Sequence, residues 1–147
     1  MEYSDLTQTN MTIKEFITHI QIISKDKKSL WTGFGITDIK YNDRKQSIKV
    51  TFVYYEQQNI CYEFSIDDVF FMAKMEENML PNSLSPDIPK QPFINVYEDS
   101  NLLKFVIKDF LIHEVYKNEP PFRHYQFTAQ NMNLHIVSRG EPYIKTP

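Results

Sequence analysis

Glycine is scarce in this chain of 147 residues, and its scarcity argues against nucleotide binding. Of the three glycines, Gly33 and Gly35 lie close together but lack the third glycine and the following helical pattern of a dinucleotide fingerprint. Loops that cradle phosphates need clustered glycines because the backbone must approach the anion closely. Rossmann-type and P-loop folds are therefore not expected.

Cysteine is rarer still, and the histidines have no ligand spacing. The single cysteine, Cys61, cannot form an internal disulfide, which is typical of a reducing compartment. No His-x-His, His-Glu-x-x-His or Cys-x-x-Cys spacing occurs, and His19 and His113 lie in expected helices without a ligand partner four residues on. We therefore predict no metal, no cofactor and an inert thiol.

Long apolar runs are missing as well. No apolar stretch approaches the roughly 20 residues that a membrane span requires. The first five residues, Met1 to Asp5, have an acidic start and no apolar segment, unlike a signal peptide. We expect a cytoplasmic protein that does not contact membranes.

Arginine is the last scarce residue, since the 16 basic residues comprise 13 lysines and three arginines. Few bidentate phosphate contacts are therefore available. The formal net charge of -3 argues against nucleic acid as a partner and mildly favours a basic protein. Apolar residues, by contrast, make up 41% of the chain, which is enough for a packed core and excludes a disordered chain.

Three helices are expected from apolar residues at helical spacing. The first opens at Thr12, where Glu15 completes a capping box. A second is expected over roughly 67–79. Ser100 is expected to cap a third, over about 101–116, and apolar residues on most of its sides predict a central, buried position.

Five strands are expected from alternating residues rich in Ile, Val, Phe, Tyr and Thr. They form a three-stranded meander over 36–41, 46–56 and 60–66, and a C-terminal hairpin over 122–129 and 133–139. The fold class is therefore α+β, with one antiparallel sheet, about three helices and the order α-βββ-α-α-ββ.

The turns predict the register of the meander. A turn over residues 42–45 places Ile39 opposite Ile48. A three-residue loop, 57–59, pairs Tyr54 with Tyr62 and keeps the apolar rows of both strands on one face.

The length of the chain suits a single domain, 1–147. A proline-rich connecting loop is expected at 81–92. Its prolines recur every three residues from Pro86 to Pro92, which either stiffens the connection or presents a docking ridge.

The C-terminal hairpin holds the most specific candidate for catalysis. One face forms a core row of Tyr125, Phe127, Ala129, Leu134 and Ile136. On the other face the expected register places His124 opposite Arg139 and His135 opposite Thr128, with Arg123 at the edge. Two histidines and an arginine provide the base, acid and cation of metal-independent phosphodiester cleavage. Alternatively, this is the solvent face of an edge hairpin, where polar residues belong.

Acidic pairs are the candidates for partner binding. Adjacent carboxylates on a helix do not face each other, so helix capping explains them better than an acid–base dyad does. They still supply a negative patch for a cationic partner, and Tyr55 is expected to point away from the core row of its strand. The candidate contact residues are Tyr55, Glu63, Asp67, Asp68, Glu76, Glu77, Glu98 and Asp99.

The overall profile is similar to that of bacterial immunity proteins, which neutralise a cognate secreted toxin by binding it. No single motif carries this resemblance, so it implies no particular site residues. We expect a non-catalytic immunity protein or inhibitor whose partner is a basic toxin domain. The alternatives are a small phosphodiesterase or nucleic-acid-binding domain that uses the hairpin, and a secretion or assembly chaperone. The sequence leaves open whether the protein forms a homodimer.

Overall fold

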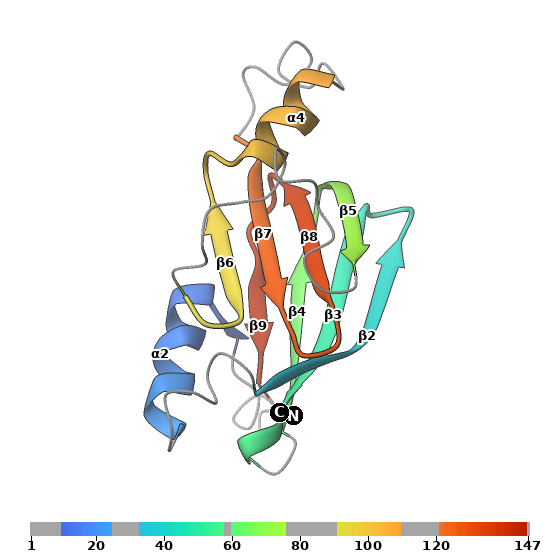
Figure 1. Ribbon diagram of the computed structural model, residues 1–147. Coiled ribbons are helices and arrows are strands. Elements are labelled where there is room, and N and C mark those ends of the chain that lie inside the picture. Colours follow the sequence, from blue (N-terminus) through green and yellow to red (C-terminus); the bar gives the residue numbers. More distant parts are fainter. Residues whose placement is uncertain (1–9, 25–32, 58–59, 76–90, 110–120, 147) are drawn as a thin grey trace.

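The computed structural model describes residues 10–24, 33–57, 60–75, 91–109 and 121–146. These residues form two antiparallel sheets that face one another (Figure 1). Sheet A has the spatial order β1 (Asn10–Met11), β9 (Tyr143–Lys145), β4 (Ile60–Ile66), β3 (Ser47–Tyr54) and β2 (Phe34–Asn42). Sheet B has the order β5 (Val69–Met75), β8 (Asn133–Ser138), β7 (Arg123–Thr128) and β6 (Ile94–Tyr97). The described helices are α2 (Ile13–Ile23) and α4 (Asn101–Asp109), and a short 3-10 turn, η1, covers Tyr55–Gln57.

One apolar core fills the space between the sheets and reaches α2. Phe64 of β4 meets Phe127 of β7 edge to face, with ring centroids 4.8 Å apart. Phe16 of α2 packs in the same way against Phe52 and Tyr62, at 5.6 and 5.3 Å. Aromatic side chains therefore join the two sheets and the first helix.

The expected single sheet with three helices is wrong, because the described residues form two sheets and are mostly β. The main error is the segment expected as a helix over 67–79, whose residues Val69–Met75 form strand β5. Asp67 and Asp68 do not begin a helix but form a turn, and Asp68 has a left-handed φ of 53°. A short apolar run is compatible with a helix or with a strand. Residues 69–75 form a strand because they pair with β8, which is distant in the sequence.

The other strands have the expected faces but a register shifted by two residues. Ile39 pairs with Val50 instead of Ile48, and Tyr54 pairs with Ile60 instead of Tyr62. A shift of two keeps every side chain on its face, so the expected core rows are buried. In the second turn, η1 adds residues to the connection that the three-residue loop did not include.

The C-terminal hairpin has the expected core row but is not solvent-exposed on its other face. Tyr125, Phe127, Leu134 and Ile136 belong to the core, and Ala129 packs against it. The second face is buried as well, since Val137 packs in a smaller apolar cluster with Leu102, Leu103 and Val106 of α4 and with Phe122. The expectation that this face of the hairpin is open to solvent is therefore wrong, because α4 and Phe122 cover it.

Both described helices begin where the sequence predicts. Thr12 and Glu15 form the capping box of α2. The hydroxyl of Ser100 accepts from the backbone N–H of Leu103, at 3.1 Å, and so caps α4. The position of α4 differs from the expected central one, because it lies at one end of the sheets and Phe105 is 37% exposed (Figure 1).

Several expectations lie outside the described residues. These are the end of the third helix beyond Asp109 and the proline-rich connection at 81–92 up to residue 90. Strands β6 and β9 were not expected; β9 pairs with β4 and also with β1. In the part of the chain that is described, neither helix has the length and apolarity to cross a membrane.

Candidate functional site

The candidate site lies at one end of the sandwich, which we call the turn end. It comprises the β2–β3 turn (43–46), the β4–β5 turn at Asp67–Asp68 and the connection between β8 and β9 (139–142). The backbone N–H of Val69 donates to the carbonyl of Gln46 at 2.8 Å, and Ser138 Oγ donates to the carbonyl of Asp67 at 2.6 Å. Gly140 packs directly on the backbone of Asp67. These hydrogen bonds and the close approach of Gly140 thus tie the three connections together.

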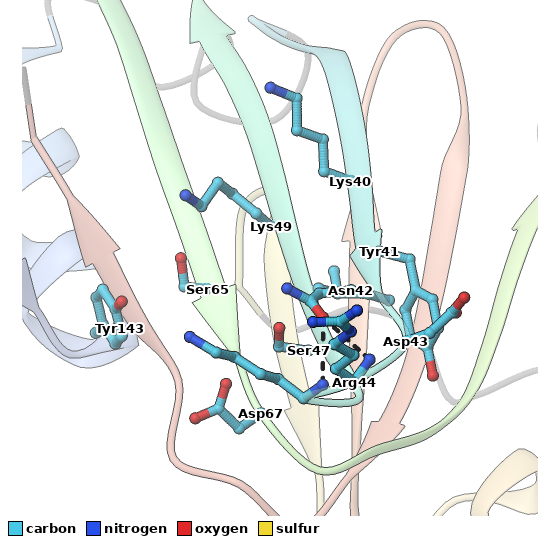
Figure 2. A pocket seen from close by; sticks show the side chains of 12 residues that line it. Lys40, Tyr41, Asn42, Asp43, Arg44, Ser47, Lys49, Ser65, Asp67 and Tyr143 are labelled. Atoms are coloured by element: carbon cyan, nitrogen blue, oxygen red, sulfur yellow. Dashed lines mark hydrogen bonds between the residues drawn. The ribbon is translucent and has the colours of Figure 1, made fainter.

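An open pocket of about 740 Å³ lies on the outer face of sheet A at this end (Figure 2). We call it the basic pocket, because its lining includes Lys40, Arg44, Lys45 and Lys49. The remaining lining residues are Tyr41, Asn42, Asp43, Ser47, Ile48, Ser65, Asp67 and Tyr143. Four basic side chains therefore face two acidic ones in a protein whose net charge is -3.

The β2–β3 turn is held by one asparagine side chain. Asn42 Oδ1 accepts from the backbone N–H groups of Arg44 and Lys45, at 3.0 and 3.2 Å. This Asx turn fixes the backbone from which both basic side chains project. Gln46 then takes a left-handed φ of 50° and leads the chain into β3.

The two lysines on the sheet come from neighbouring strands. Lys40 of β2 lies directly opposite Lys49 of β3 in the register. Each has a carboxylate nearby: Lys40 Nζ is 3.9 Å from the exposed Asp38, and Lys49 Nζ is 3.6 Å from the half-buried Glu63. Exposed pairs of this kind contribute little to stability, so both ammonium groups can exchange partners readily.

Two tyrosines flank the basic pocket. Tyr143 and Tyr41 lie on opposite sides of it (Figure 2) and are 44% and 49% exposed. Tyr41 also lines a smaller pocket of about 230 Å³, together with Asp68, Phe70 and Arg139. Tyr41 therefore connects two hollows of the turn end.

The structure brings four of the predicted acidic residues to the turn end. Asp67 and Asp68 form its central turn. The pKa of Arg123 is raised mainly by its hydrogen bond with Tyr125 and to a smaller extent by the charges of Glu141 and Glu98, which places Glu98 near Arg123. Asp99 pairs with Lys104 at 3.3 Å beside the start of α4. Basic side chains thus interleave with these carboxylates, and the turn end is a mixed surface rather than the expected negative patch.

The other predicted contact residues lie apart. Glu63 is in the middle of the outer face of sheet A, beside Lys49. Tyr55 is 46% exposed at the opposite end of the sandwich, where its ring stands over Gly35. Glu76 and Glu77 lie outside the described residues.

The two hairpin histidines form a buried hydrogen-bonded chain. His124 Nε2 is 2.9 Å from His135 Nδ1, and His124 Nδ1 is 2.8 Å from Ser100 Oγ. The side chains meet because the register, shifted by two from the expected one, pairs His124 with Val137 and His135 with Gln126. Both residues are buried, with exposures of 0% and 3%.

Burial keeps this pair neutral. Burial, with a contribution from the neighbouring His135, lowers the pKa of His124 to about 3, and burial lowers the pKa of His135 to about 4. Arg123 instead lies at the turn end, where it pairs with Glu141 at 3.5 Å, and Arg139 lines the smaller pocket. The hairpin therefore presents no accessible pair of imidazoles to a phosphodiester.

Metal binding has no support in the described ranges, where no group of three or more His, Cys, Asp or Glu side chains is placed to hold an ion. Cys61 is exposed on β4. The described basic pocket has neither imidazole nor thiol in its lining.

The sequence reasoning missed the basic pocket. Its signal was present, because Lys40, Arg44, Lys45 and Lys49 fall within ten residues on both sides of one turn. The missing information was the register, which sets Lys40 beside Lys49, and the position of the unexpected strand β9, which adds Tyr143. Comparison of the chain with models of protein families, with curated protein sequences and with solved structures gives no match.

Proposed function

We propose that this chain is a non-catalytic binding protein, an immunity protein or inhibitor that neutralises a bacterial toxin by direct contact in the cytoplasm. The observation that carries the proposal is the make-up of the basic pocket, where Arg44 lines the same hollow as the half-exposed Tyr41 and Tyr143. Tyrosine and arginine are among the residues that contribute most to affinity at protein interfaces.

The shape of the turn end supports a protein partner. Small-molecule sites are enclosed and mostly apolar, with a few polar groups that orient the ligand. The basic pocket is open to solvent, and lysine, serine and aspartate side chains line much of it. Its surroundings mix acidic and basic groups, which is typical of surfaces that select a partner by electrostatic complementarity.

The phosphodiesterase alternative has weaker support, because its acid–base pair, His124 and His135, is buried. A specific observation favours the chaperone alternative. Strand β5 is an edge of sheet B, and its residues Phe70 and Met72 are 41% and 40% exposed. An extended client segment can add to such an edge through backbone hydrogen bonds. Homodimerisation through an edge strand stays a prediction, which light scattering of the purified chain checks.

The test uses the products of the genes adjacent to the one that encodes this chain. Each product is expressed in a bacterial host with and without the chain. We expect one product to arrest growth, the chain to restore growth, and the purified pair to bind one to one in calorimetry. If no adjacent product is toxic, or if growth is restored without binding, the proposed function is wrong.

The same assay separates the chaperone alternative. The variant Met72→Ser removes an exposed apolar group of the β5 edge that lies outside both pockets of the turn end. An inhibitor that uses the turn end keeps its activity in this variant. Loss of a client's solubility without any effect on a toxin supports the chaperone instead.

A further inference from the structure

Like charges lie together in the basic pocket at a cost to the fold. Lys40 and Lys49 are directly opposite on neighbouring strands, where two like charges destabilise a sheet. Arg44 and Lys45 add two more cations at the adjoining turn, and neither forms an ion pair with another described residue. A neutral side chain at position 40 relieves the repulsion, so stability of the sheet does not explain this arrangement.

Hydroxyl groups complete a set of donors for an anion. Ser47, Ser65 and Tyr143 line the same pocket as the four cations. Hydroxyl groups donate to carboxylate or phosphate oxygens, and lysine and arginine make the stronger charge-assisted bonds. The pocket therefore has the chemistry to hold several anionic oxygens at once.

The arrangement of the acids limits the length of the anion. Asp38 lies beside Lys40, Glu63 lies beside Lys49, and Asp43 and Asp67 line the pocket. A nucleic-acid strand requires a continuous basic track, because it carries a phosphate at every nucleotide. In this pocket, carboxylates border the group of cations and interrupt any longer basic track. A compact cluster of negative charges therefore fits, and a long polyanion does not.

The tyrosines indicate which compact anion the pocket accepts. A phosphate-bearing small molecule requires an enclosed site to bury most of its surface, whereas this pocket is open and about 740 Å³ in volume. Tyr41 and Tyr143 offer aromatic contact on both sides of the cations (Figure 2). Aromatic anchors around charged groups suit a protein segment.

We propose that the basic pocket binds an acidic segment of the protein partner, with two or more neighbouring carboxylates placed between Lys40, Lys49 and Arg44. The inference rests on the proposed binding function and names the chemistry of the contact. The carboxylates of the partner replace Asp38 and Glu63 as counter-ions of the two lysines. The segment that contacts this pocket is therefore acidic, whereas the net charge of the chain favours a basic partner.

The test is an NMR titration of the full ¹⁵N-labelled chain with a hexaglutamate peptide. We expect shifts at the amides of residues 40–49, Ser65 and Tyr143, with a dissociation constant of about 1 mM or below. Binding should weaken at least about threefold between 20 and 200 mM salt, because the contacts are exposed and screened. A hexaglutamine peptide should leave these amides unshifted.

Matched variants locate the contact. The double variant Lys40→Gln with Lys49→Gln should lose about tenfold in affinity for hexaglutamate. The control Lys14→Gln with Lys74→Gln makes the same change in net charge on the exposed residues of α2 and β5, and should keep its affinity. Thermal unfolding monitors the fold, and the Lys40/Lys49 variant should be at least as stable as the parent chain.

Other outcomes overturn the inference. Shifts outside the pocket, or equal losses in the two double variants, show that net charge alone attracts the peptide. Tighter binding of pyrophosphate or of a 12-nucleotide single strand shows a phosphate site. Undiminished neutralisation of a toxin by the Lys40/Lys49 variant refutes this contact and leaves the proposed function standing. Hexaglutamate binding without any toxic neighbour refutes the proposed function instead.

Discussion

The chain from Ser100 through His124 to His135 shows how single residues acquire their chemistry from packing. In the sequence His124 and His135 are polar residues of a hairpin, and in the structure they are buried and hydrogen-bonded to each other. An unpaired buried imidazole costs free energy, and the chain that ends on Ser100 offsets that cost. The same burial makes protonation of either ring unfavourable.

Stability should therefore fall in mild acid. The folded-state pKa values of His124 and His135 lie near 3 and 4, below the value of about 6.5 for an exposed histidine. Between these limits the unfolded chain binds more protons than the folded chain, so stability is complete above pH 7 and declines as the pH drops through 6.5. Each imidazole contributes up to about 1.4 kcal/mol per pH unit. Urea unfolding at pH 7.5, 6.0 and 5.0 measures the decline.

A control isolates the pair from other groups. The pKa of Glu15 is lowered by its bonds to Thr12, and its effect appears only below pH 4.5. His19, whose pKa burial also lowers, remains in a His124→Gln, His135→Gln double variant. This variant should have a much flatter profile between pH 7.5 and 5.0. Equal stability of the parent chain at both pH values contradicts the explanation.

At the scale of elements, local patterns predicted faces better than partners. Alternation placed the core rows of β3, β4 and the hairpin correctly, and the capping box located the start of α2. The expected register was wrong by two residues in all three hairpins, β2–β3, β3–β4 and β7–β8, because loop length and η1 depend on contacts beyond the turn. The helix expected over 67–79 is wrong because the apolar run of residues 69–75 is too short to distinguish a helical period from that of a strand.

Two glycines test the packing of these elements, Gly140 in the turn end and Gly35 on β2. A methyl group at Gly140 meets the backbone of Asp67, whereas one at Gly35 meets the far end of the Tyr55 side chain. Backbone cannot move without disturbing the β4–β5 turn, but the half-exposed tyrosine can swing away. We expect Gly140→Ala to cost roughly 1–3 kcal/mol and Gly35→Ala clearly less. Chemical denaturation of both variants gives the comparison, and equal costs contradict it.

At the scale of the whole molecule, aromatic contacts between sheets hold the sandwich together. Phe127 touches Phe64 across the sheets and also packs against Phe93, with ring centroids 4.8 and 5.5 Å apart. Because both sheets share one core, a substitution that destabilises one sheet should also destabilise the other. The basic pocket, in contrast, lies on the outer face of sheet A and takes no part in this core.

Phe127→Ala should destabilise the protein as a unit. Loss of this fully buried ring leaves a cavity between the sheets, and we expect a cost of about 3–5 kcal/mol. Far-ultraviolet circular dichroism and amide exchange of both sheets should report a single unfolding transition. Separate transitions for the two sheets contradict a shared core. Phe105→Ala, on the exposed side of α4, serves as a control and should cost much less.

The sequence by itself determined the local features: the start of both described helices, the alternation of five strands and the apolar rows that enter the core. Each depends on residues a few positions apart, so spacing and capping suffice to predict it. Only the tertiary structure decided that the described strands form two sheets, that β5 is a strand, that the histidine pair is buried and that four cations meet at the turn end. These depend on pairings between distant segments, because β5 finds its partner in β8 and Tyr143 reaches the pocket through β9.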